Sequence, residues 1–225
     1  VLITAPAKGI PNIVHGVNHL EHDPDSISIF SAASCTTNAI TPVLKAVEDS
    51  LGVVHGHLET IHAYTNDQNL VDNMHSKYRR GRAAALNMVI TETGAGKAVA
   101  KALPSLEGKL TSNAIRVPVP NGSLAILNLQ VGNATSKSGI NAIIKKYALE
   151  GDLVEQIKFS LDNELVSSDI VGSAQPSIYD SNATIVTEDG KNVVLYVWYD
   201  NEYGYSQQVI RLAKYIAKVR RFTYY

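Results

Sequence analysis

Residues 31–38 read Ser31-Ala32-Ala33-Ser34-Cys35-Thr36-Thr37-Asn38, and an apolar pattern at helical spacing follows over residues 40–51. This order indicates a turn of small residues that leads into a helix, with Cys35 at or near the helix N-terminus. Cys35 is the only cysteine of the chain, so it cannot form a disulfide within it. Free N–H groups and the helix dipole lower the pKa of a thiol at such a position. Two interpretations stay open here, a reactive thiolate and a small buried hydrophobic side chain.

The composition is that of an ordinary globular protein. Apolar residues make up 45% of the 225 residues, charged residues make up 18%, and the formal net charge is -1. A nucleic-acid-binding domain carries a basic excess, so the near-zero charge argues against one. The densest basic cluster, Lys77, Arg79, Arg80 and Arg82, suits a small anion better than a polymer. No apolar run is long enough to span a bilayer, and no signal peptide is visible. With a single cysteine, these features favour the cytoplasm.

Short apolar segments open the chain. Residues 1–5, 12–18 and 28–30 read as three short strands linked by Pro and Gly, and they resemble the end of a doubly wound, Rossmann-type α/β sheet. No Gly-x-Gly-x-x-Gly follows a strand in the chain, so the loop that cradles a dinucleotide pyrophosphate is not among these residues. We therefore expect residues 1–33 to be the C-terminal remnant of a dinucleotide-binding domain that is truncated at its N-terminus.

The remaining pattern predicts long strands alternating with a few helices. Residues 66–82 are polar and lack periodicity, which is typical of a long functional loop, and residues 157–171 are ambiguous. The predicted strands are residues 53–64, 111–119, 123–132, 184–187 and 192–199, and the predicted helices are residues 94–103, 138–149 and 203–219. Ser138 is the expected N-cap of the second of these helices.

The turn at residues 118–122 predicts a hairpin between the two strands that flank it. Long strands joined by hairpins and backed by helices predict an α+β domain with a largely antiparallel sheet. We expect this domain to span residues 34–203 and to be followed by a C-terminal helix in residues 204–225.

His62 is a second candidate for chemistry. It lies near the end of the strand that returns from the helix of Cys35, and a helix followed by a returning strand can bring two such side chains together. A thiol needs a base to become a strong nucleophile, and an imidazole supplies one. The chain has seven histidines, so position alone does not single out His62.

Three further segments carry groups that bind anions. Residues 91–97 read Thr-Glu-Thr-Gly-Ala-Gly-Lys before a helical pattern, and hydroxyls with free N–H groups at a helix start form phosphate sites. A plain N-cap is the commoner use of such a sequence. Arg116 interrupts an apolar strand, where an arginine either faces solvent or pairs with an anion. Arg80 in the long loop can bind an anion too, although a solvated arginine is the simpler interpretation there.

Together these segments resemble the phosphorylating glyceraldehyde-3-phosphate dehydrogenase family. The matching segments are SCTTN at 34–38, HAYTNDQ at 62–68, RRGRAAA at 79–85, TG at 93–94, RVPVPN at 116–121 and WYDNEYGYS at 198–206. They come in the family's order and at its spacing, and they cover essentially the whole chain. The resemblance implies a catalytic domain preceded by the last strands of the dinucleotide-binding domain, without roughly the first third of the family's length.

The resemblance implies the oxidation and phosphorylation of D-glyceraldehyde 3-phosphate in glycolysis. Cys35 would attack the aldehyde carbon to form a hemithioacetal, and its backbone N–H would help to hold the oxyanion. His62 would raise the reactivity of the thiol and take the substrate proton as hydride leaves to NAD, with NADP not excluded. Inorganic phosphate would then attack the thioester and release 1,3-bisphosphoglycerate.

The resemblance also implies two anion sites and a nicotinamide contact. Thr65 and Arg116 would hold the substrate phosphate. Asn201 would bind the nicotinamide carboxamide, and Tyr205 would lie near the ring. The residues that would hold the attacking phosphate are Ser34, Thr36, Arg80, Thr93 and Gly94. In this family the loop of residues 66–82 packs between subunits, which implies a homotetramer; the resemblance implies no metal, nucleic-acid or membrane partner.

Three positions depart from the usual family pattern. Ala39 stands where many relatives have a second cysteine, and Ile90 and Glu92 replace a proline and a small hydroxyl residue beside Thr93. A carboxylate at position 92 would repel phosphate unless it points away or pairs with a lysine or arginine.

Alternatives to this function remain open. They are a relative that oxidises another phosphorylated aldehyde, such as erythrose 4-phosphate, and a fragment without catalytic activity, because the glycine-rich dinucleotide fingerprint is absent. A cysteine–histidine hydrolase is a weaker alternative, since it would explain neither Asn201 nor the two sets of phosphate-binding residues.

Overall fold

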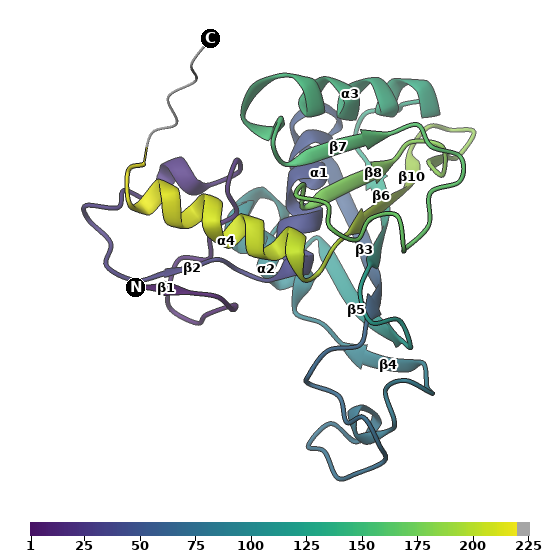
Figure 1. Cartoon of the computed structure of the whole chain (residues 1–225). Helices are drawn as coiled ribbons and strands as arrows, with labels where there is room; N and C mark the ends of the chain where they lie inside the picture. The colour runs from purple at the N-terminus through teal and green to yellow at the C-terminus, as the bar shows by residue number, and fades with distance from the viewer. Residues whose placement is uncertain (220–225) are drawn as a thin grey trace.

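A computed structural model describes residues 1–219 of the chain. Within them the main sheet has eight strands in the order β4-β5-β3-β6-β10-β8-β7, with β9 paired to β10 (Figure 1). The strands are β3 Val53–Ala63, β4 Val89–Glu92, β5 Leu110–Val117, β6 Ser123–Val131, β7 Ile157–Ser160, β8 Ser177–Asp180, β9 Ile185–Val186 and β10 Asn192–Tyr199. Five of the seven strand pairings are antiparallel, which confirms the predicted sheet type.

The helices of the described residues pack beside this sheet and at its end. The α-helices are α1 Cys35–Leu51, α2 Ala95–Ala102, α3 Lys137–Leu149 and α4 Tyr203–Ile216. Short 3-10 helices are η1 His19–Glu21, η2 Tyr78–Gly81, η3 Pro104–Leu106 and η4 Gly151–Leu153. Among residues 1–219, every helix falls short of the length and apolar character that crossing a membrane requires.

Local sequence sets both ends of α1. The extended N-cap Ser34 accepts a hydrogen bond from the Thr37 backbone N–H at 3.1 Å, which satisfies one of the free donors of the first turn. Asn38 Nδ2 donates to the Ala32 carbonyl at 2.8 Å and so ties this turn to the preceding segment. Gly52, at φ +67, ends the helix in a conformation that favours glycine. The predicted placement of Cys35 at a helix N-terminus is confirmed.

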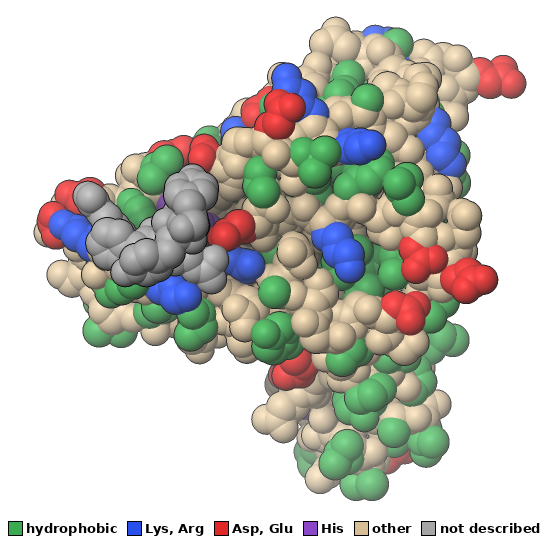
Figure 2. Space-filling model, turned by 45° about the horizontal axis from the view of Figure 1, so that its top comes forward, with side chains coloured by type: hydrophobic (Ala, Val, Ile, Leu, Met, Phe, Trp, Pro, Cys, Tyr) green, Lys and Arg blue, Asp and Glu red, His purple; other side chains and the backbone are tan. Residues whose placement is uncertain are grey.

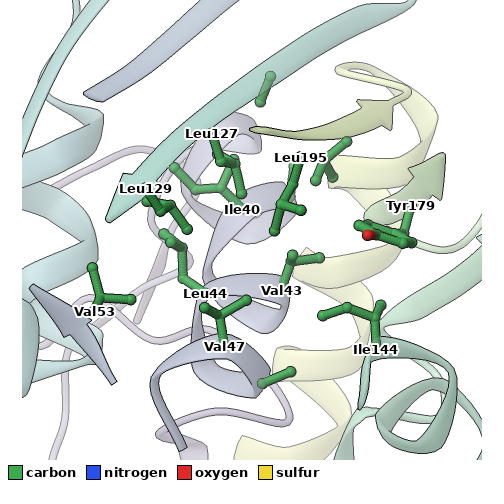
Figure 3. Close-up of a cluster of buried hydrophobic side chains, with 14 of the residues drawn as sticks. Ile40, Val43, Leu44, Val47, Val53, Leu127, Leu129, Ile144, Tyr179 and Leu195 are labelled. Carbon is green, nitrogen blue, oxygen red and sulfur yellow. The ribbon is translucent and has the colours of Figure 1, made fainter. Parts of the chain in front are cut away.

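The hydrophobic core lies between α1, α3 and one face of the sheet. Ile40, Val43, Leu44 and Val47 recur at helical spacing on α1 and are fully buried. Figure 3 shows these side chains pointing toward Leu127, Leu129 and Leu195 of the sheet and Ile144 of α3. On β6 the buried side chains alternate with partly buried or exposed ones, so the opposite face of the sheet is much less covered.

The predicted hairpin between residues 111–119 and 123–132 is wrong. In the structure β3 lies between β5 and β6, parallel to β5 and antiparallel to β6. Pro118 and Pro120 have no N–H to donate to a hairpin ladder. The connection instead crosses the end of β3, where the Tyr64 N–H donates to the Val119 carbonyl at 3.2 Å. The parallel pairing places the C-terminal ends of β3 and β5 at the same edge of the sheet.

The N-terminal region also differs from its prediction. β1 Leu2–Ile3 and β2 Phe30–Ser31 form a parallel two-stranded sheet, but residues 12–18 contribute only one bridge, from Asn12 to Ser31. The rest is a turn, because Gly16 has φ +83 and the Asn18 side chain accepts from the Val14 N–H at 2.8 Å. The α4 residue Leu212 packs against Phe30, so α4 covers this small sheet (Figure 1).

Other boundaries shift as well. β4 and β8 were not predicted, and β7 occupies the start of the ambiguous segment. α3 begins one residue earlier than expected, because Ser136 rather than Ser138 accepts the capping bond from the Gly139 N–H at 3.1 Å. α4 ends at Ile216, short of the predicted residue 219, and residues 220–225 of the predicted C-terminal helix lie outside the described residues.

Truncation of the core side chain Leu44 to alanine should destabilise the chain strongly. The side chain has no exposed surface, so Leu44→Ala leaves a cavity and should lower the free energy of unfolding by about 3–5 kcal/mol. Urea unfolding followed by circular dichroism measures it. Leu149→Ala, at a position that is 65% exposed on the same layer of helices, is the matched control and should change stability by no more than about 0.5 kcal/mol. Equal effects of the two substitutions would contradict the packing described here.

Candidate active site

Cys35 and His62 meet at the end of the sheet. Cys35 is the first residue of α1 and His62 is the next-to-last residue of β3. The Cys35 Sγ lies 3.5 Å from the His62 Nε2, within hydrogen-bonding distance for sulfur. Ala33, just before the N-cap, has φ +55, an uncommon conformation for a residue other than glycine. This sharp turn redirects the chain from β2 into α1 and presents the thiol to the imidazole.

Burial favours the neutral form of both side chains. Burial raises the pKa of the Cys35 thiol, although hydrogen bonds from Thr36 and the charge of Arg116 act in the opposite direction. Burial also lowers the pKa of His62 to about 4, and the positive charge of Arg116 adds to that effect. The helix N-terminus favours a thiolate, but the effect of burial on the thiol pKa is larger.

A cavity of about 310 Å³ opens beside this pair. Eight of the eleven site residues predicted from the sequence line it, and they come from α1, β3, β5, the 66–88 segment and the start of α2. These eight are Ser34, Cys35, Thr36, His62, Arg80, Thr93, Gly94 and Arg116. The other three, Thr65, Asn201 and Tyr205, are not among its lining residues. The structure therefore brings together the proposed catalytic pair and most of the proposed anion-binding groups.

Arg80 is held firmly in the wall of this cavity rather than solvated. Its side chain is only 10% exposed. Its Nε donates to the Thr91 Oγ1 at 2.8 Å, its Nη2 donates to the Glu92 carbonyl at 3.2 Å, and its Nη1 pairs with the Asp67 carboxylate. The simpler interpretation of Arg80 as a solvated loop residue is therefore wrong, because three partners fix the guanidinium at the cavity.

Arg116 lies directly across from His62 in the β3–β5 register. Its Nη1 is 2.6 Å from the His62 Nδ1 and donates to the Ala63 carbonyl at 3.0 Å. Its Nε is buried and has no hydrogen-bond partner. Arg116 therefore contacts the base directly while keeping hydrogen-bonding capacity that the protein does not use.

Two uncharged groups complete the surroundings of the pair. The Thr36 Oγ1 lies 2.9 Å from the Tyr199 hydroxyl, and the Tyr199 ring meets His62 edge-on with ring centres 5.8 Å apart.

At the start of α2, the Ala95 N–H donates to the Thr93 Oγ1 at 3.3 Å. The N-cap Gly94 has no side chain to cap α2, and Gly94 and Ala95 line the cavity. The Gly96 N–H donates to the Ser112 Oγ at 3.1 Å.

The charge of Glu92 is directed away from the cavity interior. Its side chain is 92% exposed, and its carboxylate lies 4.0 Å from the Lys77 Nζ. Both residues line the mouth of the cavity. The carboxylate beside the anion-binding residues is thus oriented outward and paired with a lysine. Lys77 was not predicted as a site residue, although it belongs to the basic cluster of residues 77–82. Tyr199 was not predicted either, although it lies within the WYDNEYGYS segment.

The predicted cofactor residues border the catalytic pair on its other side. The Ser123 Oγ donates to the Asn201 Oδ1 at 2.8 Å and accepts from the Ala63 N–H at 3.1 Å, which links Asn201 to the residue after His62. The Tyr205 hydroxyl donates to the Ala33 carbonyl at 2.9 Å, two residues before Cys35. In the described part of the chain, no three His, Cys, Asp or Glu side chains gather as a metal ion would require.

Comparison with known families agrees with this geometry. The family described as "Glyceraldehyde 3-phosphate dehydrogenase, C-terminal domain" matches residues 34–201. The chain belongs to the glyceraldehyde-3-phosphate dehydrogenase family. The match covers α1 through β10 and contains both members of the Cys35–His62 pair.

Individual members of the glyceraldehyde-3-phosphate dehydrogenase family are similar over almost the entire chain. A protein of Pseudomonas aeruginosa strain UCBPP-PA14, named a glyceraldehyde-3-phosphate dehydrogenase-like protein, is 58% identical over 97% of this chain and 47% of its own length. The glyceraldehyde-3-phosphate dehydrogenase of Streptomyces coelicolor is 46% identical over 96% of this chain and 64% of its own length. The glyceraldehyde-3-phosphate dehydrogenase of Mycobacterium bovis BCG is 47% identical over 97% of this chain and 63% of its own length. The chain thus spans about half to two thirds of these relatives.

The raised thiol pKa predicts a distinctive pH dependence of Cys35 alkylation. At pH 7 iodoacetamide should react with Cys35 more slowly than with free cysteine, because less of the buried thiol is ionised. The rate should still be rising above about pH 8.5, where an ordinary cysteine is half ionised. Mass spectrometry follows the reaction, and Cys35→Ser controls for modification elsewhere. A rate that levels off near neutral pH would show that the helix N-terminus outweighs burial.

Proposed function

We propose that this chain is the thioester-forming catalytic domain of an NAD(P)-dependent dehydrogenase. In this proposal it converts D-glyceraldehyde 3-phosphate and inorganic phosphate into 1,3-bisphosphoglycerate, as in glycolysis. The observation that carries the proposal is the 3.5 Å contact between the Cys35 Sγ and the His62 Nε2, in a cavity lined by Arg80 and Arg116. A nucleophile, a base and two anion-binding cations within one cavity fit an acyl transfer to phosphate.

The neutral pair sets the order of the proton transfers. As the Cys35 sulfur attacks the aldehyde carbon, its proton passes to the His62 Nε2, so the thiolate forms only during the attack. The aldehyde oxygen then takes up a proton to give the hemithioacetal hydroxyl, and His62 is returned to its neutral form. When hydride leaves the same carbon, His62 accepts the hydroxyl proton and a thioester remains on Cys35. Phosphate attacks the thioester, the carbon–sulfur bond breaks, and Cys35 is released.

Two anion sites would hold the reactants on either side of the sulfur. Arg116, with Thr65, would bind the phosphate group of the aldehyde. Arg80 and the start of α2 would bind the attacking phosphate, together with the hydroxyls of α1. The support is physical, because a buried guanidinium and helix N-terminal N–H groups favour phosphate oxygens. The backbone N–H of Cys35, at the start of α1, would help to hold an oxyanion on the attacked carbon.

The cofactor supplies one function, the acceptance of hydride. The residues that would hold its nicotinamide fit that task. Ser123 fixes the orientation of the Asn201 amide by donating to its Oδ1, which leaves the Asn201 NH₂ group to donate to a carboxamide oxygen. Tyr205 is anchored through its hydroxyl, so its ring has a fixed position near the thiol. Asn201 is linked through Ser123 to Ala63, next to His62, and Tyr205 contacts Ala33, two residues before Cys35, so both residues lie close to the catalytic pair.

The segment between β3 and β4 supports assembly into a homotetramer. It projects from the sheet, and Figure 2 shows hydrophobic side chains gathered on this lower projection. Large apolar side chains of this segment that are more than half exposed are Leu70, Val71, Met74, Tyr78, Leu86 and Met88, and Ile90 of β4 adjoins them in the sequence. Exposed apolar surface of this extent is typical of a protein interface. We infer that other subunits cover it.

A cofactor-free reaction tests the proposed acyl chemistry on this chain. p-Nitrophenyl acetate should acetylate Cys35 with release of p-nitrophenolate, and inorganic phosphate should then convert the thioester into acetyl phosphate and free thiol. His62→Asn should slow the acylation by about 10²–10⁴-fold, because the thiol loses its base. The p-nitrophenolate absorbance and a hydroxamate assay measure the two steps, and Cys35→Ser is the control for other nucleophiles. Deacylation to acetate alone, at the same rate with and without phosphate, would contradict phosphate as the acceptor.

The Lys77–Glu92 pair should tune the affinity for the attacking phosphate. Lys77→Ala leaves the Glu92 carboxylate unpaired at the cavity mouth, and we expect it to raise the phosphate concentration for half-maximal deacylation by about two- to fivefold, as for an exposed pair. Glu92→Ser should lower that concentration. Lys97→Ala, an exposed lysine of α2 that does not line the cavity, is the matched control. If Lys97→Ala had the same effect as Lys77→Ala, overall charge rather than the pair would be responsible.

A further inference from the structure

The turn that leads into α1 is held at three successive carbonyl groups. The Asn38 Nδ2 donates to the Ala32 carbonyl at 2.8 Å and to the Ser34 carbonyl at 2.9 Å. The Tyr205 hydroxyl donates to the Ala33 carbonyl between them at 2.9 Å. Ala33 has φ +55, a conformation that a residue other than glycine keeps only where its surroundings enforce it. The three hydrogen bonds enforce it, and two of them come from the Asn38 amide.

The Asn38 amide is itself held by a chain of buried amide groups. Its Oδ1 accepts from the Gln208 Nε2 of α4 at 3.3 Å. The same Nε2 donates to the Gln156 Oε1, and the Gln156 Nε2 lies 3.3 Å from the His15 Nδ1. Asn38, Gln208 and Gln156 are each at most 2% exposed, so this amide chain depends on the protein for its hydrogen bonds.

Arg211 fixes the orientation of the amide chain. A guanidinium only donates hydrogen bonds, and the Arg211 Nη1 donates to the Gln208 Oε1 at 2.7 Å. The Gln208 NH₂ group therefore points away from Arg211 and donates to the oxygens of the other two amides. The Asn38 NH₂ group is then left for the turn, where backbone carbonyls only accept. Both ends of the amide chain thus require the same orientation.

An inverted amide would place like groups together. If Gln208 were turned over, its NH₂ group would face Arg211 and its oxygen would face the oxygens of its two partners. If Asn38 were turned over, its oxygen would face the two carbonyls that it now holds. A buried polar group without a partner costs free energy. The amide chain therefore has one favourable arrangement, and that arrangement holds the turn.

His15 matches this orientation at the far end. The Gln156 oxygen accepts from Gln208, so the Gln156 NH₂ group faces the His15 Nδ1, which has to carry a lone pair. Burial is the main cause that lowers the pKa of His15 to about 4, so its ring is neutral at pH 7. The neutral ring then carries its proton on Nε2. The contacts run without a break from the N-terminal segment to the first turn of α1.

We propose that Gln208 is a positioning residue for Cys35, which acts by orienting Asn38 and thereby the turn of residues 32–34. The inference rests on the proposed function, since it takes Cys35 as the nucleophile. The turn maintains the 3.5 Å contact between the Cys35 Sγ and the His62 Nε2. A misplacement of about 1 Å can slow a reaction by about 10²-fold, so Gln208 affects the acylation rate although it does not line the cavity.

A double-mutant cycle on the acetylation of Cys35 by p-nitrophenyl acetate tests the proposal. Gln208→Met keeps a side chain of similar length but removes both donors, and it should slow the acetylation by about 10- to 10²-fold. His62→Asn should then slow it further by a factor about fivefold or more smaller than in the unsubstituted chain, because the sulfur has already lost its fixed place beside the Nε2. Gln207→Met, the same change at the partly exposed neighbour on α4, is the matched control and should leave both rates unchanged.

The cycle distinguishes positioning from stability. If Gln208→Met only lowered the fraction of folded protein, His62→Asn would have the same factor in both backgrounds, and the proposal would be overturned. An acetylation rate equal to that of Gln207→Met would overturn it too. Gln208→Glu keeps the shape and the contact with Arg211 but presents a carboxylate that donates to neither partner. It should show the same loss of coupling and takes the place of Gln208→Met if that variant does not fold.

Nitrogen NMR of the ¹⁵N-histidine-labelled chain tests the orientation without a substitution in the amide chain. At pH 7 the His15 Nδ1 should resonate in the range of an unprotonated ring nitrogen and the Nε2 in the range of a protonated one. The signals that vanish in His15→Phe assign them. A protonated Nδ1 at pH 7 would contradict the fixed orientation and with it the proposal.

These results are separable from those that test the proposed function. Failure of phosphate to deacylate acetylated Cys35 would contradict the proposed function and leave the effect of Gln208 on acetylation intact. Phosphate-dependent deacylation together with an unchanged acetylation rate in Gln208→Met would contradict this proposal alone.

Discussion

The parallel pairing of β3 with β5 is the constraint on which the site depends. It puts His62 and Arg116 at matching positions of adjacent strands and brings both strands to an end at one edge of the sheet. α1 starts at that edge, because the left-handed turn at Ala33 directs the chain there from β2. The helix, the two strands and the projecting segment each contribute one or two side chains, and none of them forms a site alone.

The same arrangement accounts for the raised pKa of the Cys35 thiol. Cys35 has the helix N-terminus and a nearby arginine, both of which favour a thiolate, yet it is packed so closely that the neutral form prevails. His62 is neutral for the same reason. Burial thus favours the neutral thiol, while the His62 Nε2 that can take its proton lies 3.5 Å from the sulfur.

Local sequence was enough to predict α1, β3, β6 and β10, because a capping serine, helical spacing and alternating apolar residues are written in neighbouring positions. β8 escaped prediction because all four of its side chains are buried and do not alternate. The false hairpin arose because β3, whose Gly56 pairs with Leu110 of β5, lies between the two strands although it comes much earlier in the sequence. Pairings of this kind are decided by tertiary packing.

The site residues, like the strands, could be predicted from local sequence but not where tertiary packing decides. Residues within recognisable motifs, such as Cys35, His62 and Thr93, could be named in advance. Lys77 and Tyr199 were not named, although Tyr199 lies within the WYDNEYGYS segment, because each contacts the site through a partner from a separate element. The effect of burial on the thiol was also out of reach, since one-dimensional spacing does not show how closely a side chain is surrounded.

The packing of α4 on the N-terminal sheet has a consequence for biosynthesis. Leu212 lies against Phe30, and the Tyr215 hydroxyl donates to the His22 carbonyl 193 residues earlier in the chain. On the ribosome, residues 1–33 emerge before the rest of this chain but lack these partners until α4 has been translated. The sheet around α1 can therefore form before α4 emerges, whereas residues 1–33 stay without their cover, and exposed to chaperones and proteases, until α4 has been made.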